Sequence, residues 1–210
     1  MSKKTVAIVG GGHAGVEAAL AISKIGLRCI LVTLKSDAIG RMSCNPAIGG
    51  LAKGHLVKEI DALDGIMARA ADEAGIQFRL LNRSRGAAVR GNRCQADRKL
   101  YKKSIQGMLS SEPSLKIYSG TVIEFIKSTK GSVKGVKLET GEKFCSEATI
   151  LTTGTFLNGM IHIGTKAVSA VIVADLIFEV PLSIAPNPEV IDPESNAPVV
   201  TILELPAITP

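Results

Sequence analysis

The segment TVAIVGGGHAGVEAALAISKIGLRCILVT, residues 5–33, decides the fold of this chain. Its first five residues are apolar and mostly β-branched, as in a buried parallel strand, and the glycine-rich turn 10–15 follows directly. Small and apolar residues then predict a helix over residues 14–25, and residues 28–33 predict a second parallel strand. A strand, a turn, a helix and a strand within about 30 residues make the βαβ unit of a dinucleotide-binding fold.

The turn carries the glycine fingerprint of dinucleotide-binding sites. Gly10 makes the tight turn, Gly12 admits a pyrophosphate against the backbone, and Gly15 lets helix and strand approach each other. The phosphates then lie at a helix N-terminus, where backbone N–H groups attract anions. The alternative is a glycine-rich turn that binds no ligand. The predicted cofactor-binding residues of this turn are Gly10, Gly11, Gly12, His13, Ala14 and Gly15.

The end of the second predicted strand departs from the fingerprint. An acidic residue usually binds the ribose hydroxyls at this position, whereas this sequence has Thr33. The threonine hydroxyl can still donate or accept a hydrogen bond, and Asp37 lies too far into the following loop to be assigned. We therefore expect the phosphate site to be present, with Thr33 as the candidate ribose contact.

The remaining pattern predicts an α/β, Rossmann-like domain with a β-rich excursion. A loop over residues 36–54, rich in Gly, Ser, Asn and Pro, is long enough to line a site. Apolar residues at helical spacing follow from Leu56 to Met67, where Gly65 bends or ends the helix, and again over residues 100–109. Strands are predicted over residues 115–118, 121–126, 132–138 and 148–152, with a hairpin turn at Thr140-Gly141.

Charge divides the chain in two. All 25 Lys and Arg lie at or before Lys166, so with 13 acids residues 1–166 carry a net +12, whereas the six acids of residues 167–210 give −6. No glycine follows Gly164, and seven of the nine prolines lie at or beyond Pro181. We predict a boundary near Lys166, followed by an acidic, Pro-rich tail of uncertain fold. The basic body is typical either of a polyanionic partner such as RNA or of a solubility device.

Composition also excludes some classes of protein. The absence of Trp and an aromatic content of 3% argue against a nucleic-acid module based on stacking. The four cysteines form no CxxC pair, so we predict a reduced, cytoplasmic setting and no metal site. The most apolar stretch, residues 167–185, is interrupted by Asp175, Glu179 and Pro181, which predicts no membrane span.

Two segments resemble one family more closely than the fingerprint alone does. GGGHAGVEAA (residues 10–19) and MSCNPAIGG (residues 42–50) are similar to the MnmG (GidA) family of tRNA wobble-uridine modification enzymes. The resemblance covers residues 5–164, and the non-acidic Thr33 agrees with it. Further similar segments are KGHLVKE (53–59), DAL (61–63), GIQF (75–78), GAAVR (86–90), QADR (95–98) and TGTFL (153–157).

The resemblance implies a flavoprotein that binds FAD and, elsewhere in its chain, NADH. With an MnmE-type GTPase, such an enzyme adds a carboxymethylaminomethyl group at C5 of the wobble uridine of tRNA, with methylene-tetrahydrofolate as one-carbon donor, and it forms a homodimer. By this resemblance, residues 10–15 form the loop that binds the pyrophosphate. The backbone of Val122 is then expected to contact the adenine, and Gly154 is expected to close the cofactor site.

The resemblance ends near Gly164. It therefore implies a partial FAD-binding domain over residues 1–165 and a divergent tail over residues 166–210, without the NADH site. We expect this truncated fold to leave a sheet edge open where a later strand of the family would pair.

Cys44 lies in the SCNPAIGG segment and is the candidate catalytic residue. Near a flavin its thiolate could act as nucleophile or as a redox or proton-transfer group. The alternative is a small buried apolar residue, which free cysteine often is. His13 and His55 are candidates for acid–base groups or, more simply, for loop hydrogen bonds, and His162 has no stronger claim.

Residues 79–103 contain nine Lys or Arg and one acid, Asp97. Such a stripe predicts contacts to tRNA phosphates that weaken as salt rises, and the alternative is a solvated face. The candidate nucleic-acid residues are Arg79, Arg83, Arg85, Arg90, Arg93 and Arg98.

Three functions therefore compete at this stage. The first is a flavin-dependent tRNA-modifying enzyme of which this chain is an incomplete copy. The second is a non-catalytic FAD- or RNA-binding fragment that acts through a partner. The third is a flavoprotein that methylates tRNA with folate and FAD, against which the SCNPAIGG segment argues.

Overall fold

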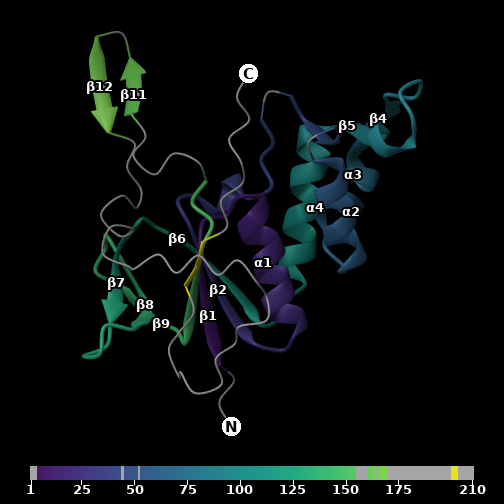
Figure 1. Ribbon diagram of the computed structural model, residues 1–210. Helices are drawn as coiled ribbons and strands as arrows, with labels where there is room; N and C mark the ends of the chain where they lie inside the picture. Colours follow the sequence, from purple (N-terminus) through teal and green to yellow (C-terminus); the bar gives the residue numbers. More distant parts are fainter. Residues whose placement is uncertain are drawn as a thin grey trace.

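The computed structural model describes residues 4–43, 45–51, 53–154, 160–163, 165–169 and 200–202. Its centre is a parallel sheet with strand order β13-β10-β1-β2-β6 (Figure 1). The sheet and the helix that follows β1 confirm the predicted βαβ unit and the α/β class. The strands are β1 (Thr5–Val9), β2 (Arg28–Thr33), β6 (Leu115–Ser119), β10 (Ala148–Leu151) and β13 (Val200–Ile202).

Helix α1 (His13–Lys24) begins one residue before the predicted start and crosses beside the sheet. Ala19 and Leu20 on its buried face pack into the main core. The chain leaves the helix through Gly26, whose φ of 82° is a conformation that side chains other than glycine rarely adopt.

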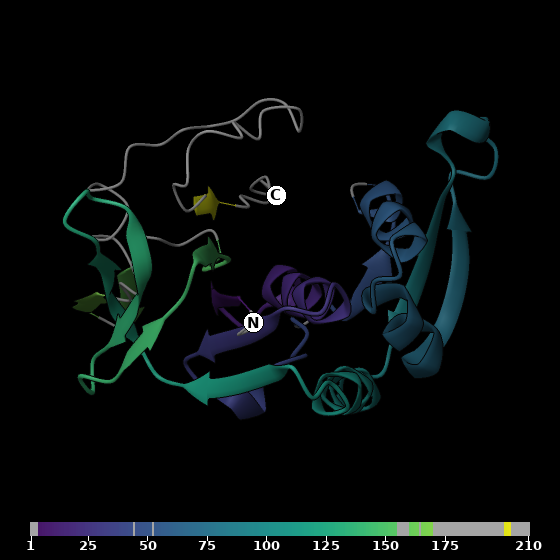
Figure 2. The same cartoon turned by 90° about the horizontal axis from the view of Figure 1, so that it is seen from below.

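Both faces of the central sheet are covered, and side chains that alternate along its strands enter two different cores. Ile8 and Leu31 point to the side of α1, whereas Val9 and Val32 belong to a second core on the opposite side. That second core is closed by an antiparallel sheet, which Figures 1 and 2 show at one end of the molecule. This sheet is the predicted β-rich excursion, and it consists of β7 (Val122–Lys127), β8 (Val133–Leu138) and β9 (Lys143–Cys145).

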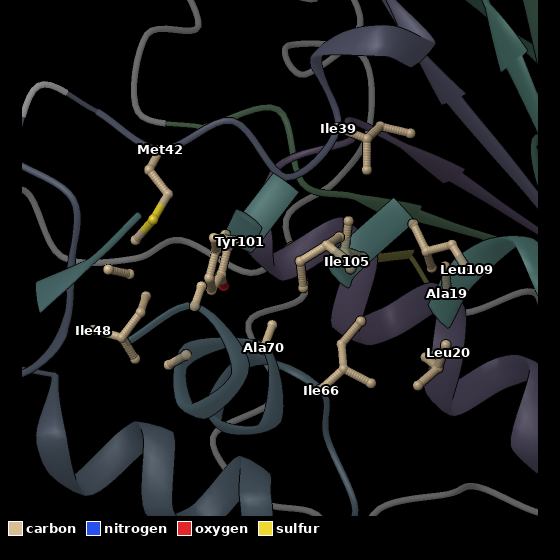
Figure 3. Packing of buried hydrophobic residues seen from close by; sticks show 14 of the residues in the cluster. Ala19, Leu20, Ile39, Met42, Ile48, Ile66, Ala70, Tyr101, Ile105 and Leu109 are labelled. Atoms are coloured by element: carbon tan, nitrogen blue, oxygen red, sulfur yellow. The ribbon is translucent and has the colours of Figure 1, made fainter. Parts of the chain in front are cut away.

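Three further helices form the other end of the molecule. They are α2 (Gly54–Ala62), α3 (Met67–Ala74) and α4 (Arg98–Ser110), and α4 is capped by the Asp97 carboxylate, which accepts from the backbone N–H of Lys99 and Leu100. Figure 3 shows Tyr101 and Ile105 of α4 facing Ile66, Ala70 and α1 in the shared core. The core joins these helices to the central sheet, so the elements around the glycine turn are held in place.

A small antiparallel sheet, in the order β3-β5-β4, was not predicted. It consists of β3 (Ala47–Gly49), β4 (Gly75–Leu81) and β5 (Gly91–Ala96). Strand β3 lies inside the predicted loop, which also contains the short 3-10 helix η1 (Ser36–Ala38). A second such turn, η2 (Ala87–Val89), lies between β4 and β5.

The apolar pattern from Leu56 to Met67 spans two helices. Helix α2 ends before Leu63, and Asp64 has a φ of 63°. A Cβ added to Gly65 would lie 2.2 Å from the side chain of Ile60, so the chain turns tightly here. Of the two predictions for this region, a bend or an end of the helix at Gly65, the structure has an end, which comes before Gly65 at Ala62.

Beyond residue 154 the structure describes three short strands. Strand β11 (Met160–Ile163) pairs antiparallel with β12 (Lys166–Ser169), and β13 pairs parallel with β10. A sheet edge was expected to stay open where a later strand of the family would pair; in the described structure β13, which belongs to the tail, extends the sheet beyond β10 and is its edge strand. The other predictions for the tail fall outside the described residues. Among the described helices, none has the length and apolar character needed to cross a membrane.

Candidate functional site

A cleft of about 430 Å³ opens at the carboxyl ends of β1 and β2. The glycine turn forms one wall, and the residues that follow β2 and β10 form others. Tyr101 and Ile105 of α4 complete the lining. Ligands of parallel α/β sheets bind at this edge, because the loops that follow the strands converge there.

Two glycines of the turn are required by close packing. Gly10 has a φ of 113°, and a Cβ on it would lie 2.2 Å from the Thr152 carbonyl oxygen. A Cβ on Gly15 would lie 1.8 Å from the Gly10 carbonyl oxygen, so α1 can approach β1 only with glycine at this position. These two residues fit the predicted roles of tight turn and helix–strand contact.

Gly12 is different, because a Cβ on it would meet no atom of the described residues within 4 Å. It lies immediately before α1, whose N-terminus has no side-chain cap and no acidic residue in its first turn within the described chain. The start of α1 at Gly12 therefore opens onto free space beside the cleft. Such an N-terminus attracts an anion through its free N–H groups and its dipole.

Thr33 and Val122 both line the cleft, as does Gly154. The Thr33 hydroxyl oxygen lies 2.7 Å from the position of a Cβ on Gly11, so this hydroxyl faces the glycine turn. Val122 is buried at the start of β7, and Gly154 is exposed with a φ of 88°. Gly10, Gly11, Gly12 and His13 line the cleft as well, whereas Ala14 and Gly15 lie behind it in α1.

His13 lies on the cleft wall beside Tyr101, with 5.8 Å between ring centroids. Burial, and to a smaller extent the positive charge of Lys53, lower the pKa of His13 below its usual value of 6.5. The Nε2 of His13 and the hydroxyl of Tyr101 are buried without a hydrogen-bond partner in the part of the chain that the structure describes. The imidazole is therefore neutral at pH 7 and retains an unused polar atom.

Three other sequence candidates lie away from this cleft or outside the described residues. His55 is exposed on α2 and is not part of the cleft lining. Cys44 lies outside the described residues, as does the side chain of His162. The described part of the chain contains no group of three or more His, Cys, Asp and Glu residues that could hold a metal ion.

Sequence reasoning missed several residues of the cleft. Lys35 and Arg41 line it and are exposed, so they place positive charge near the predicted phosphate position. Glu17 also lines it, but its carboxylate accepts hydrogen bonds from the backbone N–H of Ile66 at 3.1 Å and of Met67 at 2.7 Å. Glu17 thus caps α3 across 49 residues of sequence, a contact that no local pattern indicates.

The candidate nucleic-acid residues do not line the cleft in the described structure. Arg79 lies on β4 and Arg93 on β5, whereas Arg98 begins α4. All but the half-buried Arg93 are exposed. The loop between β4 and β5 carries Arg83, Arg85 and Arg90.

The parallel sheet, its antiparallel cover and the glycine turn at a helix N-terminus define a dinucleotide-binding domain of the flavoprotein type. The sequence profile of the family described as "Glucose inhibited division protein A" matches residues 5–177. The chain belongs to this family.

Similar proteins agree with that assignment. The tRNA uridine 5-carboxymethylaminomethyl modification enzyme MnmG of Granulibacter bethesdensis is 56% identical over 163 residues, which are 77% of this chain and 26% of that protein. The structure of Aquifex aeolicus GidA is 45% identical, with a TM-score of 0.73 over 80% of this chain and 28% of that one. The chain thus spans about a quarter of the length of these relatives and matches their N-terminal region.

A more distant likeness concerns the fold alone. PqsL of Pseudomonas aeruginosa, described as a probable FAD-dependent monooxygenase, is 15% identical with a TM-score of 0.54. The match covers 88% of this chain and 48% of PqsL. The domain architecture is therefore shared with a protein outside the family.

Proposed function

We propose that this chain is the FAD-binding part of a flavoenzyme that adds a carboxymethylaminomethyl group to C5 of the wobble uridine of tRNA. The observation that carries the proposal is the uncapped N-terminus of α1 behind Gly12, in a chain that belongs to this family. Fold likeness alone would leave the substrate open, whereas the MnmG relative at 56% identity supports this particular reaction.

The residues of the cleft suit FAD. The open space at Gly12 leaves room for the pyrophosphate at the N-terminus of α1, and Lys35 and Arg41 offset its charge. The Thr33 hydroxyl would bind the ribose. Val122 would offer a backbone contact to the adenine, and Gly154 would close the site. The bound flavin would supply the redox chemistry of the reaction.

The rest of the reaction depends on groups beyond this cleft. Family membership supports NADH as reductant, bound by another region, and methylene-tetrahydrofolate as the one-carbon donor. It also supports an MnmE-type GTPase as partner, a homodimer and a cytoplasmic setting. Cys44 is the proposed catalytic residue: it belongs to the SCNPAIGG segment, and near a flavin its thiolate could act as a nucleophile.

We assign tRNA contact to the arginines of the β4–β5 hairpin and of the start of α4. Their guanidinium groups are mostly exposed, and the hairpin projects from the end of the molecule opposite the β7–β9 sheet (Figure 2). Exposed arginines on a projecting element can reach phosphates that a recessed site could not.

The test replaces Cys44 in the gene of the source organism and measures the modified wobble uridine in tRNA hydrolysates by mass spectrometry. We expect Cys44→Ser to abolish the modification, because a hydroxyl is a far weaker nucleophile than a thiolate. The matched control is Cys145→Ser, which changes an exposed thiol on β9 and should leave modification intact. Full modification with Cys44→Ser would remove that residue from the mechanism, and full modification after deletion of the gene would refute the proposed function.

A further inference from the structure

The β3-β5-β4 sheet presents two pairs of identical residues on its outer face. In the antiparallel register of β4 and β5, Gln77 lies opposite Gln95 and Arg79 opposite Arg93. The other face of β5 packs on α3, where the buried Cys94 thiol donates to the Ala71 carbonyl at 3.3 Å. Because side chains alternate along a strand, Arg93 and Gln95 lie on the face of β5 opposite Cys94, and the register places Arg79 and Gln77 beside them.

Two like charges directly opposite each other destabilise a sheet unless something offsets them. Among the described residues, neither Arg79 nor Arg93 forms an ion pair with a carboxylate. Arg93 Nη2 donates to the side-chain oxygen of Asn45 at 3.2 Å, which orients this guanidinium without neutralising it. A bound anion would offset the repulsion between the two arginines.

The surface around the pair is shaped to admit such an anion. A hollow of about 190 Å³ is lined by Gln77, Arg79, Leu81, Arg93 and Gln95. On the other side of Arg93 the register places Gly49 of β3, which has no side chain. A Cβ on Gly49 would lie 2.2 Å from the Asn92 carbonyl oxygen, so the backbone excludes any larger residue there. The arginine pair therefore remains accessible from above the sheet.

We propose that Arg79 and Arg93 together bind one phosphodiester group of RNA, with the Gln77 and Gln95 carboxamides donating to the adjoining backbone oxygens. A phosphodiester carries two unesterified oxygens, and each can accept from one of the two guanidinium groups, so a single anion can serve both arginines. The inference rests on the proposed function for its RNA ligand. It deepens that function, because it replaces a diffuse basic surface with a defined phosphate site.

The position of Asn45 gives this site a further consequence. Asn45 directly follows Cys44 in the sequence, and its side chain accepts the hydrogen bond from Arg93. An RNA phosphate held by the arginine pair is thus tied to the loop that carries the proposed nucleophile. The pair would place the RNA backbone beside that loop.

The test measures binding of a fluorescently labelled, unmodified tRNA transcript to the purified full chain over a series of salt concentrations. The variants are Arg79→Gln, Arg93→Gln and their double. The control pair is Lys130→Gln with Lys134→Gln, which removes the same charge from exposed positions of the β7–β8 hairpin, to which no RNA contact is assigned. Circular dichroism and thermal unfolding of each variant establish that it is folded.

If one phosphate is shared, each single substitution in the Arg79–Arg93 pair weakens binding by about tenfold, and the double is only about twofold weaker still. The slope of log affinity against log salt then falls by about 0.9 for the double, as for one phosphate contact. Additive losses with a slope change of about 1.8 would mean two separate phosphates and would overturn the inference.

Other outcomes separate this inference from the proposed function. A wild-type chain that binds no tRNA at low salt overturns the RNA role of this face, and the shared phosphate with it. A parallel calorimetric titration measures the affinity for inorganic phosphate. If Arg93→Gln lowers that affinity but leaves the affinity for tRNA unchanged, the site binds free phosphate instead of RNA. Either result leaves FAD binding in the cleft untouched.

Discussion

The Thr152 hydroxyl donates a hydrogen bond to the Gly10 carbonyl at 2.9 Å, joining residues 142 apart in the sequence. The same hydroxyl lies 3.1 Å from the Val9 carbonyl, and the Thr152 backbone N–H also donates to Val9. The glycine turn therefore rests on the end of β10 as well as on β1. A turn that looks local in sequence thus depends on a strand that comes much later in the chain.

Replacing Thr152 with valine should loosen this turn. The substitution keeps the side-chain shape but removes the hydroxyl, so the part-buried Gly10 carbonyl loses its donor at a cost of about 1 kcal/mol in the free energy of unfolding. FAD affinity should fall with it. Urea unfolding and a flavin titration measure the two effects, and Thr140→Val in the exposed hairpin turn is the control. An unchanged FAD affinity would show that β10 does not support the turn.

Gly12 and Gly15 should respond differently to alanine. A Cβ on Gly12 projects into open space, so Gly12→Ala should leave thermal stability within about 0.5 kcal/mol of wild type while weakening FAD binding at least about tenfold. A Cβ on Gly15 collides with the Gly10 carbonyl, so Gly15→Ala should lose both stability and FAD. Thermal unfolding measures the stability and a flavin titration measures the FAD affinity. Equal losses of both quantities in the two variants would contradict these roles.

Glu17 should stabilise α3 rather than bind the cofactor. Glu17→Ala removes the carboxylate that accepts from Ile66 and Met67, and the loss of such a helix cap costs about 1 kcal/mol. We expect a lower midpoint in urea unfolding. Glu142→Ala, in an exposed turn, is the control and should leave the midpoint within experimental error. A normal midpoint for Glu17→Ala would mean that the cap contributes nothing.

His13 should make stability depend on pH. Its pKa is lowered in the folded protein, so the unfolded chain binds more protons below the unfolded value of 6.5. The stability that neutral His13 contributes is therefore fully present above about pH 6.5 and is lost as pH falls through the folded pKa. Urea unfolding between about pH 7.5 and 5.5 should show a smaller pH dependence for His13→Gln than for wild type. His55→Gln, at an exposed position, should behave as wild type.

The first βαβ unit could be predicted almost to the residue. Strands β1 and β2 are continuous apolar runs because both faces of the parallel sheet are covered, and glycines mark where the chain turns. Strands β6 to β8 and β10 were predicted within about one residue. Strands β7, β8 and β10 contribute buried side chains to a core, and β6 contributes the partly buried Leu115 and Tyr118.

Strand β4 shows why the small sheet escaped prediction. Ile76 and Phe78 are 66% and 61% exposed, and five consecutive residues of the strand are solvent-accessible, so no alternation of buried and exposed residues marks it. Helical spacing misled in the same region, because Leu63 belongs to the pattern from Leu56 to Met67 yet is 84% exposed beyond the end of α2. Periodicity reports burial, and these residues are not buried.

The residues of the candidate site also differ in whether the sequence alone predicts them. Residues of the glycine turn could be predicted because each glycine answers a local requirement of the fingerprint. Lys35, Arg41 and Tyr101 could not, because they reach the cleft only through the packing of α4 and the loop after β2. The cross-strand pairing of Arg79 with Arg93 likewise depends on a register that charge counting does not reveal.

The most direct test of the central claim is the visible absorption of the purified full chain, after FAD is added and unbound flavin is removed by desalting. We predict a retained band of oxidised flavin in the wild-type chain and its loss in Gly12→Ala, which keeps the fold. A wild-type chain that is folded by circular dichroism yet retains no flavin would contradict the assignment of this cleft to FAD.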